Sequence, residues 1–210
     1  MPTWKPNYFR LFLSHVATHK EVAHVLKQDL EYLHISCFVA HEDIEPTREW
    51  QDEIEESLRT MDALAALLSP DFHKSKWTDQ EVGFAFGTER LIIPLRLGLD
   101  PYGFIAKYQG FQLTPPPNFT IAQAIAKILA RDGRTSIPFA RAVVKGLEGA
   151  GSFNTSKRCL SLLEDCAVLD EELLQRVEAS IQNNYEVREA SGVLHRVQSL
   201  AQRHRDVGSA

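Results

Sequence analysis

The stretch SKWTDQEVGFA, residues 75–85, holds the side chains whose types and spacing could do chemistry. Trp77 precedes Glu81 by four positions, so the indole and the carboxylate would share one face of a helix. A fixed carboxylate can stabilise positive charge that develops on a bound substrate. A structural alternative stays open, because Thr78-x-x-Glu81 also fits a capping box, with Glu81 at the third helical position.

Other polar residues follow the ends of predicted strands. Ser14 and His15 end the first strand, a polar loop over residues 41–49 follows the second, and residues 69–81 follow the third. In a parallel α/β sheet, ligands bind outside the carboxyl ends of the strands. We therefore expect these segments to converge on one rim, although Ser14 and His15 could instead satisfy the backbone of a turn.

The elements that must position these residues are visible in the hydrophobic pattern. Strands are expected over residues 8–14, 34–40, 63–69 and 90–97, with a short last strand before residue 113. Helical spacing of apolar residues marks the segments between them and residues 119–130. This alternation predicts βαβ units and an α/β domain with a parallel sheet covered on both faces. Pro94 indicates an edge position or a bulge in the fourth strand.

A domain boundary is expected at RDGRTSIP, residues 131–138. It divides the chain into a first domain over residues 1–135 and a small all-helical region over residues 136–210. Beyond the boundary the β pattern vanishes, and apolar residues recur in four short helical faces. A helical set of this size buries little core by itself, so we expect it to pack on the first domain or on a copy of itself.

Composition narrows the function classes. The formal net charge of −5 lacks the excess of positive charge that is typical of a nucleic-acid binder. The three cysteines, Cys37, Cys159 and Cys166, are odd in number and lack a C-x-x-C spacing, which is typical of a reducing, cytoplasmic setting. Neither an N-terminal signal segment nor an apolar run of ~20 residues is evident, so no membrane contact of its own is expected.

Metal and cofactor motifs are also missing from the pattern. The eight histidines match no ligand signature such as H-E-x-x-H, so we expect no metal site. No G-x-G-x-x-G or P-loop sequence occurs either.

The first 130 residues or so resemble a Toll/interleukin-1 receptor (TIR) domain of the kind found in bacterial immune proteins. LFLSH, FVAHEDIEPTREWQDEIEESL, LLSPDFHKSKWTDQEVGFAFG and RLIIPLRLG occur in the family's order, and the spacing of Ser75, Trp77 and Glu81 is the strongest single element. The resemblance implies a flavodoxin-like parallel sheet. One departure is Thr47, where the family often has glycine after proline.

The resemblance also implies an activity. In catalytic TIR domains a glutamate at the position of Glu81 is essential for cleaving nicotinamide from NAD. It implies a catalytic role for Glu81 and a substrate-binding role for residues around the cleft, namely Ser14, His15, Asp43, Trp50, Ser75 and Trp77. NAD would then be a substrate and not a redox cofactor. The product would be ADP-ribose or a cyclic or modified ADP-ribose signal, made in bacterial anti-phage defence.

Partners and alternatives follow from the same resemblance. It implies a homo-oligomer formed through TIR domains, in which a neighbour fixes the loop at residues 41–49, while the C-terminal helices could bind a partner protein. A non-catalytic adaptor module is the main alternative, because adaptors need not keep Glu81. A nucleoside deoxyribosyltransferase-like enzyme is a third, and the loop sequence EDIEPTREW argues against it.

Overall fold

The computed structural model describes residues 4–39 and 50–208, with side chains described for residues 4–39 and 51–205. The chain forms two compact units. The first holds Arg10–Ile125 and the N-terminal residues up to Pro6, and the second holds Ala126–Ala210 with the short segment Asn7–Phe9. These units are defined by packing, and the domain boundary expected after residue 135 stays a prediction.

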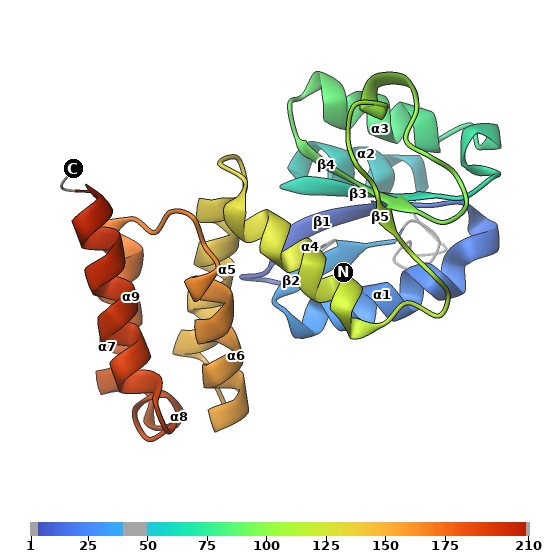
Figure 1. Cartoon of the computed structure of the whole chain (residues 1–210). Coiled ribbons are helices and arrows are strands. Elements are labelled where there is room, and N and C mark those ends of the chain that lie inside the picture. The colour runs from blue at the N-terminus through green and yellow to red at the C-terminus, as the bar shows by residue number, and fades with distance from the viewer. Residues whose placement is uncertain (1–3, 40–49, 209–210) are drawn as a thin grey trace. The chain divides into compact units, whose positions relative to one another are not determined.

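A five-stranded sheet organises the first unit (Figure 1). Its strands, in the order β2-β1-β3-β4-β5, are Ile35–Phe38, Phe9–Ser14, Ala63–Leu68, Leu91–Arg96 and Phe111–Gln112. The pairs β1–β3, β3–β4 and β4–β5 are parallel. This strand order and the parallel pairing confirm the flavodoxin-like α/β fold that the sequence predicts.

The middle of the sheet is apolar on both faces. All six residues of β3, ALAALL, are buried, as expected for a parallel strand with helices on each side. Pro94 pairs in register with Ala66 of β3, while the β5 ladder begins only at Leu95. At Pro94 the strand therefore has one ladder neighbour, which explains how a residue without an amide proton fits there.

Helices cover the sheet as the alternation predicts. Figure 1 shows α2 (Trp50–Thr60) and α3 (Thr78–Gly87) on one face and α1 (Lys20–Tyr32) on the other. Tyr32 of α1 meets Phe119 at the start of α4 (Phe119–Arg131) with ring centroids 5.8 Å apart. The described residues also form short 3₁₀ turns, η1, η2 and η3, at Ala17–His19, Phe72–Lys74 and Gly103–Ile105. The turn η2 directly precedes α3, and η3 follows β4; residues of both turns and of α3 line one pocket.

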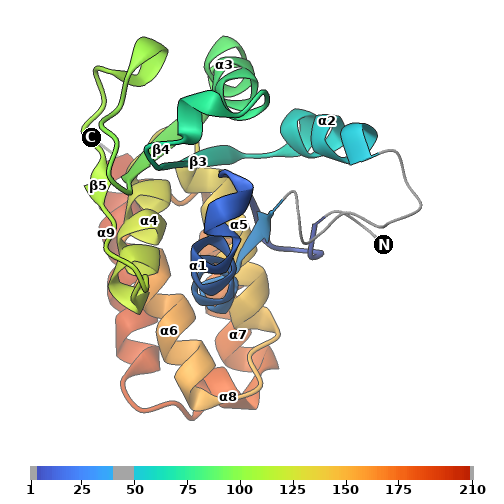
Figure 2. The same ribbon diagram turned by 90° about the vertical axis from the view of Figure 1, so that its right-hand side faces the viewer.

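The second unit is helical. It contains α5, α6, α7, α8 and α9, which span Ser136–Glu148, Phe153–Glu164, Glu171–Asn183, Tyr185–Arg188 and Val193–Gly208 (Figure 2). Ser152, Asp170 and Asn184 cap the starts of α6, α7 and α8 by accepting hydrogen bonds from backbone amides at 3.1, 2.8 and 2.8 Å.

The helices of the second unit contact one another and bury a shared interior. It is built on side chains such as Val143, Leu160, Leu173 and Val193, each fully buried. The region therefore buries more core by itself than expected, because α5 contacts α6 and α7, and α9 also contacts α6 and α7. Its packing on the first domain or on a copy of itself stays a prediction. Among the described residues, no helix is both long and apolar enough to cross a membrane.

Candidate active site

Ser14 and Glu81 meet at the carboxyl end of β1. Ser14 is the last residue of β1, and its Oγ donates a hydrogen bond to Oε2 of Glu81 on α3 at 2.5 Å. Both side chains are buried, with Ser14 1% and Glu81 4% exposed. Residues that are 67 positions apart in the sequence therefore form one polar pair at the rim where ligands bind in this class of sheet.

The capping-box alternative for Glu81 is wrong. α3 begins at Thr78, and Trp77 at the N-cap position makes no side-chain capping bond. The Thr78 hydroxyl instead donates to the carbonyl oxygen of Phe72 at 2.5 Å. Glu81 is thus the fourth helical residue, its own amide already bonds the Trp77 carbonyl at 2.9 Å, and its carboxylate is directed to Ser14.

Burial dominates the electrostatics of Glu81. Loss of solvent raises the pKa of this carboxyl to about 7, and the hydrogen bond from Ser14 partly opposes that rise. The group therefore changes its protonation state near neutral pH. A cation that approached it would favour the ionised form and lower the pKa. A carboxyl with this behaviour suits a site where positive charge appears transiently.

His15 lies at the same strand end. It directly follows β1, is 7% exposed, and its Nδ1 lies 3.2 Å from the carbonyl oxygen of Leu13. The strand therefore brings both of its predicted site residues, Ser14 and His15, to one edge. The role of His15 in binding a substrate stays a prediction.

Ser75 and Trp77 form the turn that leads into α3. The Ser75 Oγ accepts a hydrogen bond from the Trp77 amide at 3.2 Å, and both residues are half-buried. The Trp77 carbonyl in turn accepts from the Glu81 amide. The spacing seen in the sequence thus corresponds to a short connected segment that carries an indole, a hydroxyl and the buried carboxyl.

The side chains of two predicted site residues lie outside the part of the chain that the structure describes. Asp43 lies outside the described residues, and Trp50 is the first residue of α2 with its side chain outside them. Their proposed contribution to the cleft stays a prediction.

Ser69 begins the segment of residues 69–81 that the sequence predicts at this rim, although the sequence assigns it no role of its own. It directly follows β3 and is fully buried, and within the described side chains its Oγ has no hydrogen-bond partner. The sequence carries a signal for it, since Ser69 ends its strand as Ser14 ends β1. Across residues 4–39 and 50–208, no cluster of three or more His, Cys, Asp or Glu side chains could hold a metal ion.

Comparisons with known proteins give the family of this chain. A sequence model of the family described as "TIR domain" matches residues 11–129, which is more than half of the chain. A search of curated proteins gives no match. Among solved structures, the TIR domain of the Toll-related receptor TRR-2 from Hydra magnipapillata is similar, with 20% identity and a TM-score of 0.42, over 49% of this chain and 82% of that one.

Proposed function

Because this chain belongs to the TIR domain family, we propose that it is an NAD glycohydrolase that cleaves nicotinamide from NAD. The observation that carries this proposal is the buried Glu81 carboxyl, held by Ser14 at 2.5 Å and not used in a helix cap. The family includes members that cleave NAD. In this proposal Glu81 takes the place of the glutamate that the chemistry of those members needs. NAD is the substrate in this proposal, and no further cofactor takes part.

The reaction is a dissociative cleavage of the N-glycosidic bond. The bond between C1′ of the ribose and the nicotinamide nitrogen breaks, and its electron pair leaves with nicotinamide, which departs as a neutral molecule. The ribose is left with oxocarbenium character at C1′. The ionised Glu81 carboxylate stabilises that charge, and a preorganised group of this kind contributes most in a site that excludes water.

Capture of C1′ decides the product. Attack by water followed by loss of a proton gives ADP-ribose, whereas attack by an internal adenine or ribose nucleophile gives a cyclic product. Exchange with another base is the remaining outcome. A role for such a product as a signal in anti-phage defence in the cytoplasm is part of the proposal.

The remaining predicted site residues have supporting roles in this proposal. Ser14 orients the Glu81 carboxylate, and the half-buried Trp77 provides an aromatic wall for the nicotinamide ring. His15 and Ser75, together with Asp43 and Trp50 from the loop and α2, line the nucleotide. We further propose that TIR domains of this chain self-associate and that the second unit is available to a partner protein.

The direct test is incubation of the purified full-length protein with NAD, followed by mass spectrometry. Release of nicotinamide together with ADP-ribose or a cyclic isomer is expected. Intact NAD after incubation over a range of protein concentrations would contradict the proposal.

A non-catalytic interaction module is the second candidate. Phe84, Phe86 and Phe104 are large apolar side chains that are 37%, 36% and 65% exposed. The rings of Phe86 and Phe104 stack with centroids 4.7 Å apart. Exposed aromatic groups of this kind are enriched at protein interfaces. Self-association without any NAD turnover would favour this candidate.

A further inference from the structure

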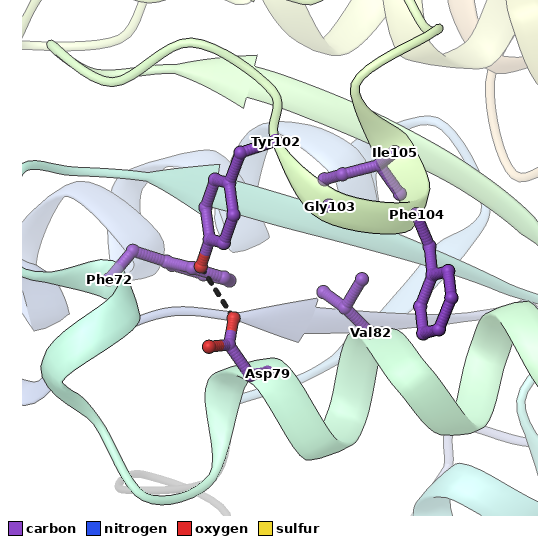
Figure 3. Close-up of a pocket in the computed structure, with 7 residues that line it drawn as sticks. All are labelled: Phe72, Asp79, Val82, Tyr102, Gly103, Phe104 and Ile105. Carbon is purple, nitrogen blue, oxygen red and sulfur yellow. Dashed lines mark hydrogen bonds between the residues drawn. The ribbon is translucent and has the colours of Figure 1, made fainter.

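A pocket with a volume of ≈ 200 Å³ lies between α3 and the turn at η3, on the first unit (Figure 3). Its apolar walls come from Phe72, Val82 and Ile105, which are 0%, 7% and 2% exposed. Tyr102 and Phe104 lie on opposite sides of the η3 turn and border the pocket with their rings. The space is therefore preformed, apolar in its depth and aromatic at its border.

One polar pair stands at the edge of this pocket. The Tyr102 hydroxyl donates a hydrogen bond to Oδ1 of Asp79 at 2.5 Å. Burial and the neighbouring Asp79 carboxylate raise the pKa of Tyr102, so the phenol stays a protonated donor. Tyr102 engages one carboxylate oxygen, and Figure 3 shows the other oxygen of Asp79 pointing away from the phenol. That oxygen can accept from a further donor.

The pocket is separate from the Glu81 site although both use α3. Asp79 and Glu81 are two residues apart, which places them ~200° apart around the helix axis. The Glu81 carboxyl bonds Ser14 on β1, whereas Asp79 bonds Tyr102 beyond β4. Neither Ser14 nor Glu81 lines the pocket.

We propose that this pocket binds a small ligand that carries a protonated amine on a compact aromatic body. A carboxylate with an oxygen that Tyr102 does not engage attracts an ammonium group, and the face of the neighbouring Tyr102 ring attracts it as well. The apolar body fits against Phe72, Val82 and Ile105. The size also agrees, since an apolar protein cavity of ~150 Å³ holds benzene. This site does not depend on the proposed NAD chemistry.

Two simple probes test the proposal on the full-length protein at pH 7. Benzylamine carries the ammonium group, and benzyl alcohol is a neutral molecule of similar shape. Titrations followed by protein NMR should give shifts confined to residues around Phe72, Asp79 and Tyr102, with benzylamine binding ~10-fold tighter than the alcohol because of the charge-assisted bond. Equal affinity of the two probes, or shifts that map elsewhere, would overturn the assignment.

Variants test the role of the Asp79 charge and the separation of the pocket from the Glu81 site. Asp79→Asn keeps an acceptor for Tyr102 but removes the charge, so the preference for benzylamine should disappear while benzyl alcohol still binds. Asp71→Asn, at an exposed aspartate that pairs with Lys74 at 2.6 Å, is the matched control and should leave the preference unchanged. Benzylamine should also still bind to Glu81→Gln. Loss of binding in that variant would show that the two sites are one, and it would do so whether or not the protein cleaves NAD.

Discussion

At the scale of single residues, the protonation of Glu81 makes the stability of the folded protein depend on pH. Its pKa is about 7 in the folded protein against an ordinary value of 4.5. Between these values the unfolded chain releases the proton while the folded chain keeps it, so the free energy of unfolding falls as pH rises. The decrease in unfolding free energy begins near pH 4.5 and levels off above pH 7. It amounts to ~3 kcal/mol for a pKa shift of this size.

The first prediction follows from this decrease in unfolding free energy with rising pH. Glu81→Gln removes the ionisable group, so the difference in unfolding free energy between pH 5 and pH 7.5 should shrink by a few kcal/mol relative to the wild type. Denaturant unfolding of both proteins at both pH values measures this. Glu56→Gln, at an exposed position on α2, is the control and should behave as the wild type does. An identical pH dependence in all three proteins would contradict the burial of Glu81.

Trp77 carries the second prediction. If its half-buried ring walls the nicotinamide pocket, Trp77→Ala should lower kcat/KM for NAD about tenfold, the size of one aromatic contact worth ~1.4 kcal/mol. Trp77→Phe should keep most of the activity, because an aromatic face is retained.

Trp4 supplies the control for that experiment. Its indole donates to the Thr60 hydroxyl at 2.8 Å, and its ring meets Phe38 at 6.1 Å between centroids. Trp4→Ala should therefore lower the melting temperature and leave the activity per folded molecule unchanged. A Trp77→Ala variant that behaves in the same way would assign Trp77 to packing alone.

At the scale of elements, the fold follows from local patterns and the site follows only in part. Apolar runs such as ALAALL identify buried strands, and helical spacing identifies α1 to α4, because both patterns depend on local burial. The capping box considered for Glu81 is the part that the structure contradicts, whereas α3 does begin at Thr78. Thr78 and Glu81 have the spacing of a capping box, but their side chains bond Phe72 and Ser14, and a sequence pattern does not contain those tertiary partners.

The same limit applies to the pocket beside α3. The bond between Asp79 and Tyr102 joins residues 23 positions apart, and it exists because η3 turns back onto α3. Nothing in the spacing of these two residues indicates the contact. By contrast, Ser14 and His15 could be placed at the rim from the sequence, since the ends of parallel strands meet at one edge.

The third prediction concerns how α3 is anchored. Thr78→Val keeps the side-chain shape but leaves the buried Phe72 carbonyl without the hydroxyl that bonds it, which should cost ~1–3 kcal/mol of unfolding free energy. Thr88→Val is the matched control, because the Thr88 hydroxyl bonds the Phe84 carbonyl at an exposed helix end at 2.8 Å. Denaturant unfolding compares the two. Equal, small losses would mean that the hydroxyl of Thr78 does not fix the start of α3.

At the scale of the whole molecule, the first unit carries the proposed chemistry and the second forms a helical bundle. The sequence of the loop at residues 41–49 contains Glu42, Asp43, Glu45 and Glu49 against one basic residue, Arg48. This segment lies outside the described residues, and the proposed contact between its charged sequence and a neighbouring TIR domain stays a prediction.

The fourth prediction is that NAD turnover depends on self-association. Specific activity should rise with protein concentration, because a neighbouring copy would supply the contact that holds the loop. Light scattering recorded alongside the assay relates activity to oligomeric state. Turnover by a strict monomer, independent of concentration, would contradict this account of activation and would leave the role of Glu81 intact.

The measurement that tests the central claim most directly is the rate of nicotinamide release from NAD by the wild type and by Glu81→Gln. Both proteins should be assayed at pH 8, above the pKa of about 7 for Glu81, with circular dichroism to establish that each is folded. The account predicts a loss of ~100-fold or more in the variant, the usual effect of removing one preorganised electrostatic group. A folded Glu81→Gln protein that releases nicotinamide at the wild-type rate would contradict it.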